Sequence, residues 1–158
     1  MTGMLNGDFD DVIKAEPFMN FLGPYRNPED LPEIYRQVHF VWAIDFFEDG
    51  LNSKWLLPNR LYEGCFHGCL PIAIEGTETA RFMKRIKLGF LLGEGTLQAV
   101  EELIAAMDAE RFAIAHRRLA EISPSTWCYT QQDCEAIIRR LQGVASGGVD
   151  AKTRSLAA

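Results

Sequence analysis

The sequence has little basic charge and no long apolar run, and each shortage excludes a class of protein. Its 158 residues hold 16 lysines and arginines against 22 aspartates and glutamates, a formal net charge of −6. A general nucleic-acid binder needs a basic face, so we expect no nucleic-acid partner. No apolar run approaches the roughly 20 residues of a membrane-spanning helix, and the acidic N-terminus does not resemble a signal peptide. We therefore expect no transmembrane segment and a cytoplasmic location.

Metal-binding and nucleotide-loop motifs are also missing. The four cysteines contain no CxxC pair, because Cys65 and Cys69 are four positions apart and Cys128 and Cys134 are six apart. Together with only three histidines, this spacing favours buried reduced thiols over a zinc site, and we expect no metal and no cofactor. The sequence has no GxGxxG, Walker or GxSxG motif, so the usual marks of dinucleotide, phosphate-loop and hydrolase chemistry are absent.

Short apolar runs alternate with amphipathic segments through the first two thirds of the chain. With 47% hydrophobic residues, the composition is typical of a globular protein. Apolar runs with little alternation are typical of strands buried on both faces of a parallel sheet. The pattern predicts a doubly wound, Rossmann-like α/β domain with about four strands. The expected strands are 17–22, 38–45, 70–74 and 87–91, and the expected helices are 8–15, 28–37, 58–68 and 77–85.

Two expectations concern the ends of this domain. A doubly wound domain usually has five or six strands, and no strand precedes the first helical pattern, so we expect the first strand to be missing. After the last strand the pattern is helical, with a break at Ser123-Pro124. We predict a single domain over 1–143 and a disordered tail over 144–158. The predicted helix caps are Thr96, Asp108, a Thr130–Asp133 capping box and, at a C-terminus, Gly143.

The segment between the second and third predicted strands is the best candidate for a ligand site. In open α/β sheets, ligands bind beyond the carboxyl ends of strands, and phosphates bind at helix N-termini. A helix starting near Pro58 would carry Arg60, Glu63 and His67 on one narrow polar side. The macrodipole disfavours a cation such as Arg60 in the first turn, and a bound anion would reverse that. The alternative is that Arg60 simply pairs with Glu63 on a solvated surface.

Neighbouring residues add to this candidate. The loop Asn52-Ser53-Lys54 brings polar donors next to the helix start. Gly64 and Gly68 flank the polar side and would allow a backbone or a ligand to come close. Asp45 ends the second predicted strand at the same edge, where a carboxylate is more often a structural anchor than a catalyst. Trp55 lies in the loop, where it can pack or stack on a flat ligand.

Three stretches of this sequence resemble a known family. They are FLGPYRNPEDLPEIYRQVHFVWAIDF, LNSKWLLPNRLYEGCFHGCLPIAIEGTET and LGFLLGEG, within residues 16–95, and PNRLYEG is the most specific block. They are similar to the C-terminal half of GT-B-fold glycosyltransferases of the group 1, family-4-like set, from bacterial exopolysaccharide (succinoglycan-type) biosynthesis. The resemblance implies half of a GT-B fold that binds a nucleotide-sugar donor as substrate without a metal. It implies that Glu63 holds the nucleotide ribose, and that Asn52, Ser53, Lys54, Asn59 and Arg60 lie near the diphosphate and sugar.

The chain also departs from the pattern of that family. The family has a paired glutamate eight residues before Glu63, where this chain has Trp55. Since 158 residues are too few for two such domains, we expect the chain to lack the N-terminal acceptor domain of the family, and the resemblance then implies a donor-binding part that is incomplete alone. The whole enzyme would transfer sugar to an exopolysaccharide or lipid-linked saccharide acceptor, peripheral to the inner membrane. No catalytic residue is identified.

Two other functions stay open. One is a non-catalytic nucleotide-binding or scaffolding subunit of a split transferase. The other is a stand-alone α/β enzyme that acts on a small phosphorylated metabolite, which would need a nucleophile or base that the sequence does not reveal.

Overall fold

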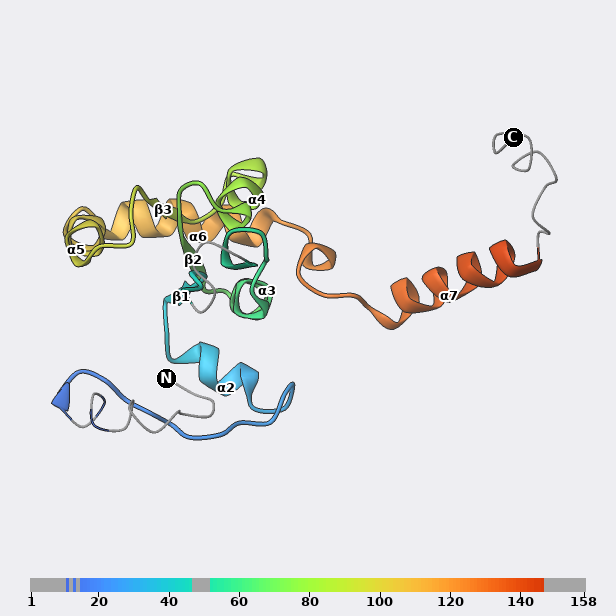
Figure 1. Cartoon of the computed structure of the whole chain (residues 1–158), viewed down its shortest axis with the longest axis horizontal. Helices are drawn as coiled ribbons and strands as arrows, with labels where there is room; N and C mark the ends of the chain where they lie inside the picture. The colour runs from blue at the N-terminus through green and yellow to red at the C-terminus, as the bar shows by residue number, and fades with distance from the viewer. Residues whose placement is uncertain (1–10, 12, 14, 47–51, 147–158) are drawn as a thin grey trace, which may run out of the picture. The chain divides into compact units, whose positions relative to one another are not determined.

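The computed structural model describes residues 11, 13, 15–46 and 52–146. The chain divides into two compact units, Met1–Glu121 and Ile122–Ala158. In the first unit, three parallel strands pair in the order β1-β2-β3 (Figure 1). The register places Phe40 beside Leu70 and Ile72 beside Phe90. The strands are β1 (Phe40–Trp42), β2 (Leu70–Ile74) and β3 (Phe90–Leu92).

Helices connect the strands and cover the sheet. The chain runs β1-α3-β2-α4-β3, the alternation that the sequence predicts. Val41 faces Gly64 of α3, whereas the ring of Phe40, the preceding residue, contacts Phe112 of α6. Successive side chains of a strand point to opposite faces, so helices lie on both sides of the sheet and the doubly wound α/β prediction is confirmed. The helices of this unit include α2 (Leu31–Arg36), α3 (Asn59–Phe66), α4 (Glu78–Ile86), α5 (Leu97–Ala105) and α6 (Ala109–Glu121), with a short 3₁₀ turn, η1 (Asn52–Lys54).

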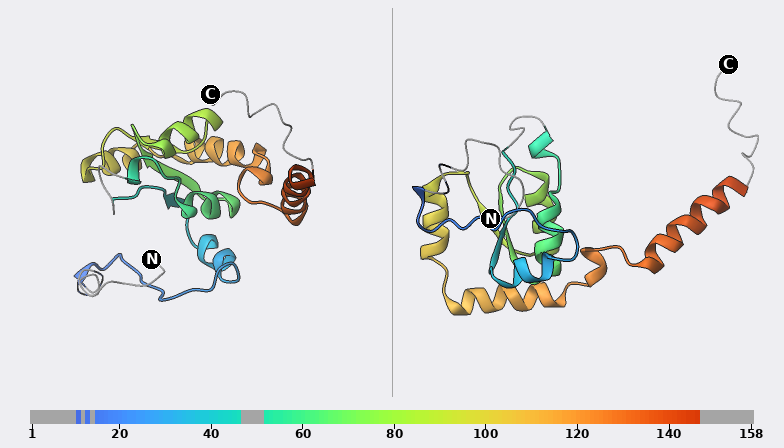
Figure 2. Two further views of the ribbon diagram at one scale, coloured as in Figure 1. Left: turned by 45° about the vertical axis from the view of Figure 1, so that its right-hand side comes forward. Right: turned by 90° about the horizontal axis from the view of Figure 1, so that it is seen from below.

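Helix α6 packs near the amino ends of the strands. The ring of Phe112 contacts His39, just before β1, and Arg118 Nη2 donates to the carbonyl of Ile86, before β3. Figure 2 shows α6, in orange, running across one end of the strands. The carboxyl ends of the strands are therefore where the loops and helix N-termini of a ligand site can gather.

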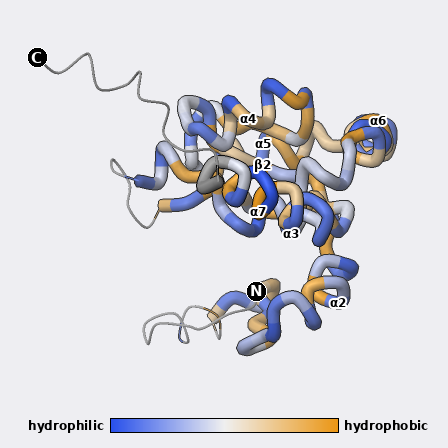
Figure 3. Tube along the Cα trace, turned by 90° about the vertical axis from the view of Figure 1, so that its right-hand side faces the viewer, coloured by the Kyte–Doolittle hydropathy of each residue, from blue (hydrophilic) through white to orange (hydrophobic). Residues whose placement is uncertain are grey.

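Side-chain caps fix the helix boundaries at several predicted places. Thr96 Oγ1 accepts from the Ala99 amide at 3.3 Å, and Asp108 Oδ1 accepts from the Arg111 amide at 2.7 Å. Both predicted caps are confirmed, and α4 has a third one at Thr77. Figure 3 shows hydrophobic and hydrophilic residues alternating along α4, as expected for a helix with one side on a sheet.

The strand predicted at 17–22 is wrong. Residues 17–18 form a turn and residues 19–22 have no regular structure. Phe18 is 94% exposed and Leu22 56% exposed, so this apolar run is not buried. A strand needs a neighbour for its backbone hydrogen bonds, and hydrophobicity alone does not supply one. Of the helix predicted at 8–15, residues 11, 13 and 15 are helical, and the others lie outside the described residues.

The second unit contains η2 (Pro124–Thr126) and α7 (Gln131–Ser146). The predicted capping box is confirmed, because the Thr130 amide donates to Asp133 Oδ2 at 2.8 Å and the Asp133 amide donates to Thr130 Oγ1 at 3.2 Å. The predicted C-cap at Gly143 is wrong, since α7 continues to Ser146. The predicted start of a disordered tail at 144 is wrong, because residues 144–146 belong to α7, and the rest of the predicted tail, 147–158, lies outside the described residues. Among the described helices, none is both long enough and apolar enough to cross a membrane.

Candidate functional site

The amino end of α3 carries no side-chain cap. The N-cap residue is Pro58, in an extended conformation, and it offers no side-chain acceptor to the first turn. Leu61 N bonds the Pro58 carbonyl at 2.9 Å, which tightens the turn. The first N–H groups of a helix that lacks a cap are left for solvent or for an anionic ligand. Pro58 therefore lies just before the first turn of α3, whereas the sequence pattern predicts that it lies within that turn.

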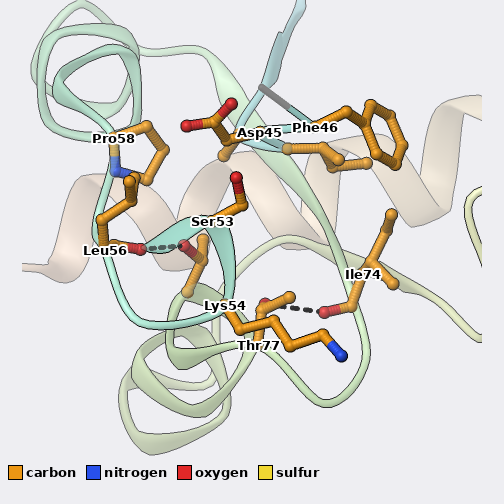
Figure 4. A pocket seen from close by; sticks show the side chains of 11 residues that line it. Asp45, Phe46, Ser53, Lys54, Leu56, Pro58, Ile74 and Thr77 are labelled. Atoms are coloured by element: carbon orange, nitrogen blue, oxygen red, sulfur yellow. Dashed lines mark hydrogen bonds between the residues drawn. The ribbon is translucent and has the colours of Figure 1, made fainter. Parts of the chain in front are cut away.

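A small hollow lies beside this helix end, where β1 and β2 end. Its volume is about 90 Å³. Figure 4 shows Asp45 and Lys54 at opposite margins, with the side chain of Ser53 between them. Lys54 supplies the basic group of the lining, and Ser53 is buried. The lining consists of Ala43, Ile44, Asp45, Phe46, Ser53, Lys54, Leu56, Pro58, Ile74, Thr77 and Thr79.

Two threonines hold the wall of the small hollow together. Thr77 Oγ1 donates to the Ile74 carbonyl at 2.8 Å and accepts from the Ala80 amide at 3.1 Å. Thr79 Oγ1 donates to the Leu56 carbonyl at 3.2 Å, which ties the loop before α3 to the start of α4 (Figure 4). The amino ends of α3 and α4 therefore both border the same space.

A larger and more open hollow, of about 640 Å³, lies on the other side of Pro58. It brings together polar residues of α3 with aromatic residues of the segment before β1 and of β1 itself. Pro58 lines both hollows, so the start of α3 separates them. The lining of the larger hollow consists of Tyr25, Asn27, Ile34, Tyr35, Phe40, Val41, Trp42, Pro58, Asn59, Arg60 and Glu63.

Arg60 is held by the end of β1. Its Nη2 donates to the carbonyl of Ile44, two residues after β1 ends. No ion pair joins Arg60 to Glu63 in the described part of the chain. The alternative in which these two side chains simply pair on a solvated surface is therefore wrong. The guanidinium lies across the carboxyl end of the strand, near the uncapped amino end of its own helix.

Glu63 accepts two hydrogen bonds from residues far away in sequence. Asn27 Nδ2 donates to Oε1 at 3.0 Å, and the Tyr35 hydroxyl donates to Oε2 at 3.2 Å. The Tyr35 ring stacks on His67, with ring centroids 5.6 Å apart. Burial, and then the negative charge of Glu63, raise the pKa of Tyr35, so its hydroxyl remains a donor over the working pH range. Burial lowers the pKa of His67.

At Gly64, helix α3 lies close to strand β1 of the sheet. A Cβ built on Gly64 would lie 2.7 Å from Val41 Cγ1, so the missing side chain lets α3 pack on β1. Of the two possibilities that the sequence leaves open at Gly64, a neighbouring chain segment or a ligand, the structure shows the neighbouring strand β1. Gly68 has a φ of +90°, which favours glycine at the turn into β2.

The cysteines have no disulfide. All four are free, with Cys65 and Cys69 buried, Cys128 half-buried and Cys134 exposed. Burial raises the pKa of Cys65 to about 12 and that of Cys69 to about 11. The prediction of buried reduced thiols holds for this pair. Within the described residues, no three histidine, cysteine or acidic side chains form a group that could hold a metal.

The structure divides the predicted site residues between the two hollows. Ser53 and Lys54 line the small one, Asn59, Arg60 and Glu63 line the large one, and Asn52 is exposed at the start of η1 and lines neither. Sequence reasoning missed Asn27 and Tyr35. They lie 36 and 28 positions from Glu63, and no local pattern signals such a pairing.

The sequence of the chain is similar to that of a known protein. No protein-family model matches the chain. Over 134 residues it is 51% identical to the succinoglycan biosynthesis protein ExoL of Rhizobium meliloti (strain 1021). The aligned part makes up 85% of this chain and 33% of that protein, so the chain spans about a third of the length of the curated relative that it matches.

Proposed function

We propose that this chain is the nucleotide-sugar-binding part of a glycosyltransferase of exopolysaccharide biosynthesis, of the GT-B type. In this proposal the diphosphate lies at the amino end of α3, and Glu63 accepts hydrogen bonds from the ribose. The acceptor is a saccharide that another domain or chain would present, at the inner face of the membrane. The donor is a substrate, and no metal or cofactor takes part.

The observation that carries the proposal is the uncapped amino end of α3 between two hollows. Helix N-termini bind phosphate because unpaired N–H groups and the macrodipole both favour negative charge. Arg60 and Lys54 add positive charge on the two sides of this helix end. Positive charge and helix amides at that position would also stabilise the nucleoside diphosphate as it leaves.

The sizes of the hollows suit a ligand that spans both. Ligand pockets usually measure about 300–1,000 Å³, and the large hollow, of about 640 Å³, falls in that range. The small hollow, of about 90 Å³, has room only for a group of phosphate size. The resemblance of PNRLYEG to the family block and the 51% identity to a protein named for succinoglycan biosynthesis support the choice of donor class.

Calorimetric titration tests this proposal. Uridine, guanosine and adenosine diphosphates are titrated into the folded chain, and we expect heat with at least one of them. Arg60→Ala should weaken that binding about tenfold, since a hydrogen bond to a charged group contributes about 1.5–3 kcal/mol. Arg36→Ala is the matched control, because the exposed Arg36 pairs with Glu33 and neither residue lines a hollow. A folded sample that takes up none of the three nucleotides would defeat the proposal.

One observation favours a second candidate, a non-catalytic scaffolding subunit. Both oxygens of Glu63 already accept hydrogen bonds from protein groups, as they would if the residue served only to tie the segment at 25–35 to α3. This candidate predicts that Glu63→Gln lowers the free energy of unfolding and leaves nucleotide affinity unchanged. Chemical denaturation measured beside the titration separates the two functions.

A further inference from the structure

Two neutral donors hydrogen-bond to the carboxylate of Glu63, one to each oxygen. Asn27 donates to one oxygen at 3.0 Å and Tyr35 to the other at 3.2 Å. Both donors, like Glu63 itself, line the large hollow. The two bonds fix the plane of the carboxylate as well as its position, because each oxygen has its own partner.

With these two hydrogen bonds in place, the carboxylate can still bind a ligand. An ionised carboxylate has about four lone-pair sites, so two donors leave about two free, one on each oxygen. A vicinal diol offers two hydroxyl donors side by side and can use one site on each oxygen. A carboxylate that is already held in place loses less side-chain entropy when a ligand binds.

We propose that Tyr35 and Asn27 are positioning residues that orient the Glu63 carboxylate for both hydroxyls of a ribose. This inference rests on the proposed function and names the residues that would give its site a preference for ribose over deoxyribose. Neither residue needs to touch the ligand, since both act through Glu63.

Tyr35 is itself held firmly enough for this role. Its side chain is half-buried, and its ring stacks on His67 at an interplanar angle of 13°. Its backbone carbonyl accepts from Cys69 Sγ at 3.4 Å, which ties α2 to the turn before β2. A side chain that is fixed at ring and backbone can in turn fix the group that its hydroxyl bonds.

The test compares a ribonucleoside diphosphate with its 2′-deoxy form on the full chain. We expect the wild type to bind the ribose form at least about tenfold more tightly. Tyr35→Phe keeps the stacked ring and removes the hydroxyl. It should abolish most of that preference, and the affinity for the deoxy form should stay the same. Tyr129→Phe, an exposed tyrosine of the second unit, is the matched control and should leave both affinities unchanged.

A second variant adds a pH readout that lost packing alone would not produce. Asn27→Asp places a carboxylate against Glu63, and the like charges should drive the two side chains apart at pH 8. Affinity for the ribose form should fall about tenfold there and recover toward pH 5, where the pair can share a proton. The affinity of the wild type should not show this recovery.

The outcomes separate the two proposals. If the wild type prefers ribose and both variants keep that preference at every pH, the positioning role is wrong and the proposed function stands. If the wild type binds ribose and deoxyribose forms alike, or binds neither, the proposed role of Glu63 fails and the positioning role fails with it. Loss of the preference in Tyr35→Phe together with the pH recovery of Asn27→Asp supports both.

Discussion

Helix α3 has two sides that are held in different ways. On one side Leu61 is fully buried and Gly64 packs directly on Val41 of β1. On the other side Arg60 and Glu63 are held by hydrogen bonds to distant parts of the chain. Close packing tolerates no added atom, whereas polar groups can exchange one partner for another. Changes on the packed side should therefore alter the stability of the fold, and changes on the polar side should alter the binding of a ligand.

The largest expected difference is in thiol reactivity. Burial raises the pKa of Cys65, on the packed side of α3, to about 12, so almost none of it is thiolate at pH 8. Because the thiolate is the nucleophile, we expect iodoacetamide to modify the exposed Cys134 at least about 100-fold faster than Cys65. Mass spectrometry of timed samples measures both rates. In denaturant all four cysteines should react at similar rates. Fast modification of Cys65 in the native chain would contradict the prediction, because it would show that the packed side of α3 is accessible to the reagent.

The next effect is on stability. Gly64→Ala would bring a methyl group to within 2.7 Å of Val41 Cγ1. Overpacking costs about 1–3 kcal/mol, while the better helix propensity of alanine returns about 1 kcal/mol. We expect the free energy of unfolding to fall by up to about 2 kcal/mol in urea denaturation. Adding Val41→Ala makes room for the methyl group, so the double variant should lose less than the sum of the two single variants.

A smaller effect is expected on the polar side. Glu63→Gln keeps the shape of the side chain and removes its charge, so nucleotide affinity should fall about tenfold. The free energy of unfolding should change by less than about 1 kcal/mol, because the amide oxygen can still accept from Tyr35. Titration and denaturation on the same samples measure both. A loss of stability larger than that of Gly64→Ala would contradict the division between the two sides.

The smallest effect is the pH dependence from His67. Burial lowers its pKa in the folded state below the usual 6.5, so between these two values the unfolded chain binds more protons. His67 therefore does not reduce the free energy of unfolding above pH 6.5, and it reduces that free energy progressively as the pH falls below 6.5. His67→Gln should flatten the slope of unfolding free energy against pH between 7 and 5. Identical slopes in the two proteins would show that His67 does not contribute.

The alternating pattern predicted the order of the three described strands and of the helices between them, although β1 and β3 differ in their bounds from the predicted 38–45 and 87–91. The run LPIAI forms β2 with the predicted bounds, because a central strand covered on both faces is apolar at almost every position. The failure at residues 17–22 has the opposite cause. That run is also mostly apolar, but the burial and pairing of a strand depend on a neighbour that a local pattern does not reveal.

The candidate site was predictable only in part. Pro58 followed by a polar side at helical spacing is a local signal, and it led to Arg60 and Glu63. The partners of these residues, the carbonyl of Ile44 and the side chains of Asn27 and Tyr35, come from elsewhere in the chain. The division of the predicted residues between the two hollows could not be predicted either. It depends on the positions that η1 and α3 take in the folded unit, since η1 lines the small hollow and α3 lines the large one.

The sequence by itself determined the α/β alternation, the parallel sheet and the caps at Thr96, Asp108 and Thr130, since periodicity and capping act over a few residues. Only the tertiary structure decided that Arg60 turns to the end of β1, and that Gly64 serves the packing of a helix. It also decided that Glu63 is held from 28 and 36 positions away. These contacts join segments whose separation in sequence carries no information about their distance in space, so folding alone brings them together.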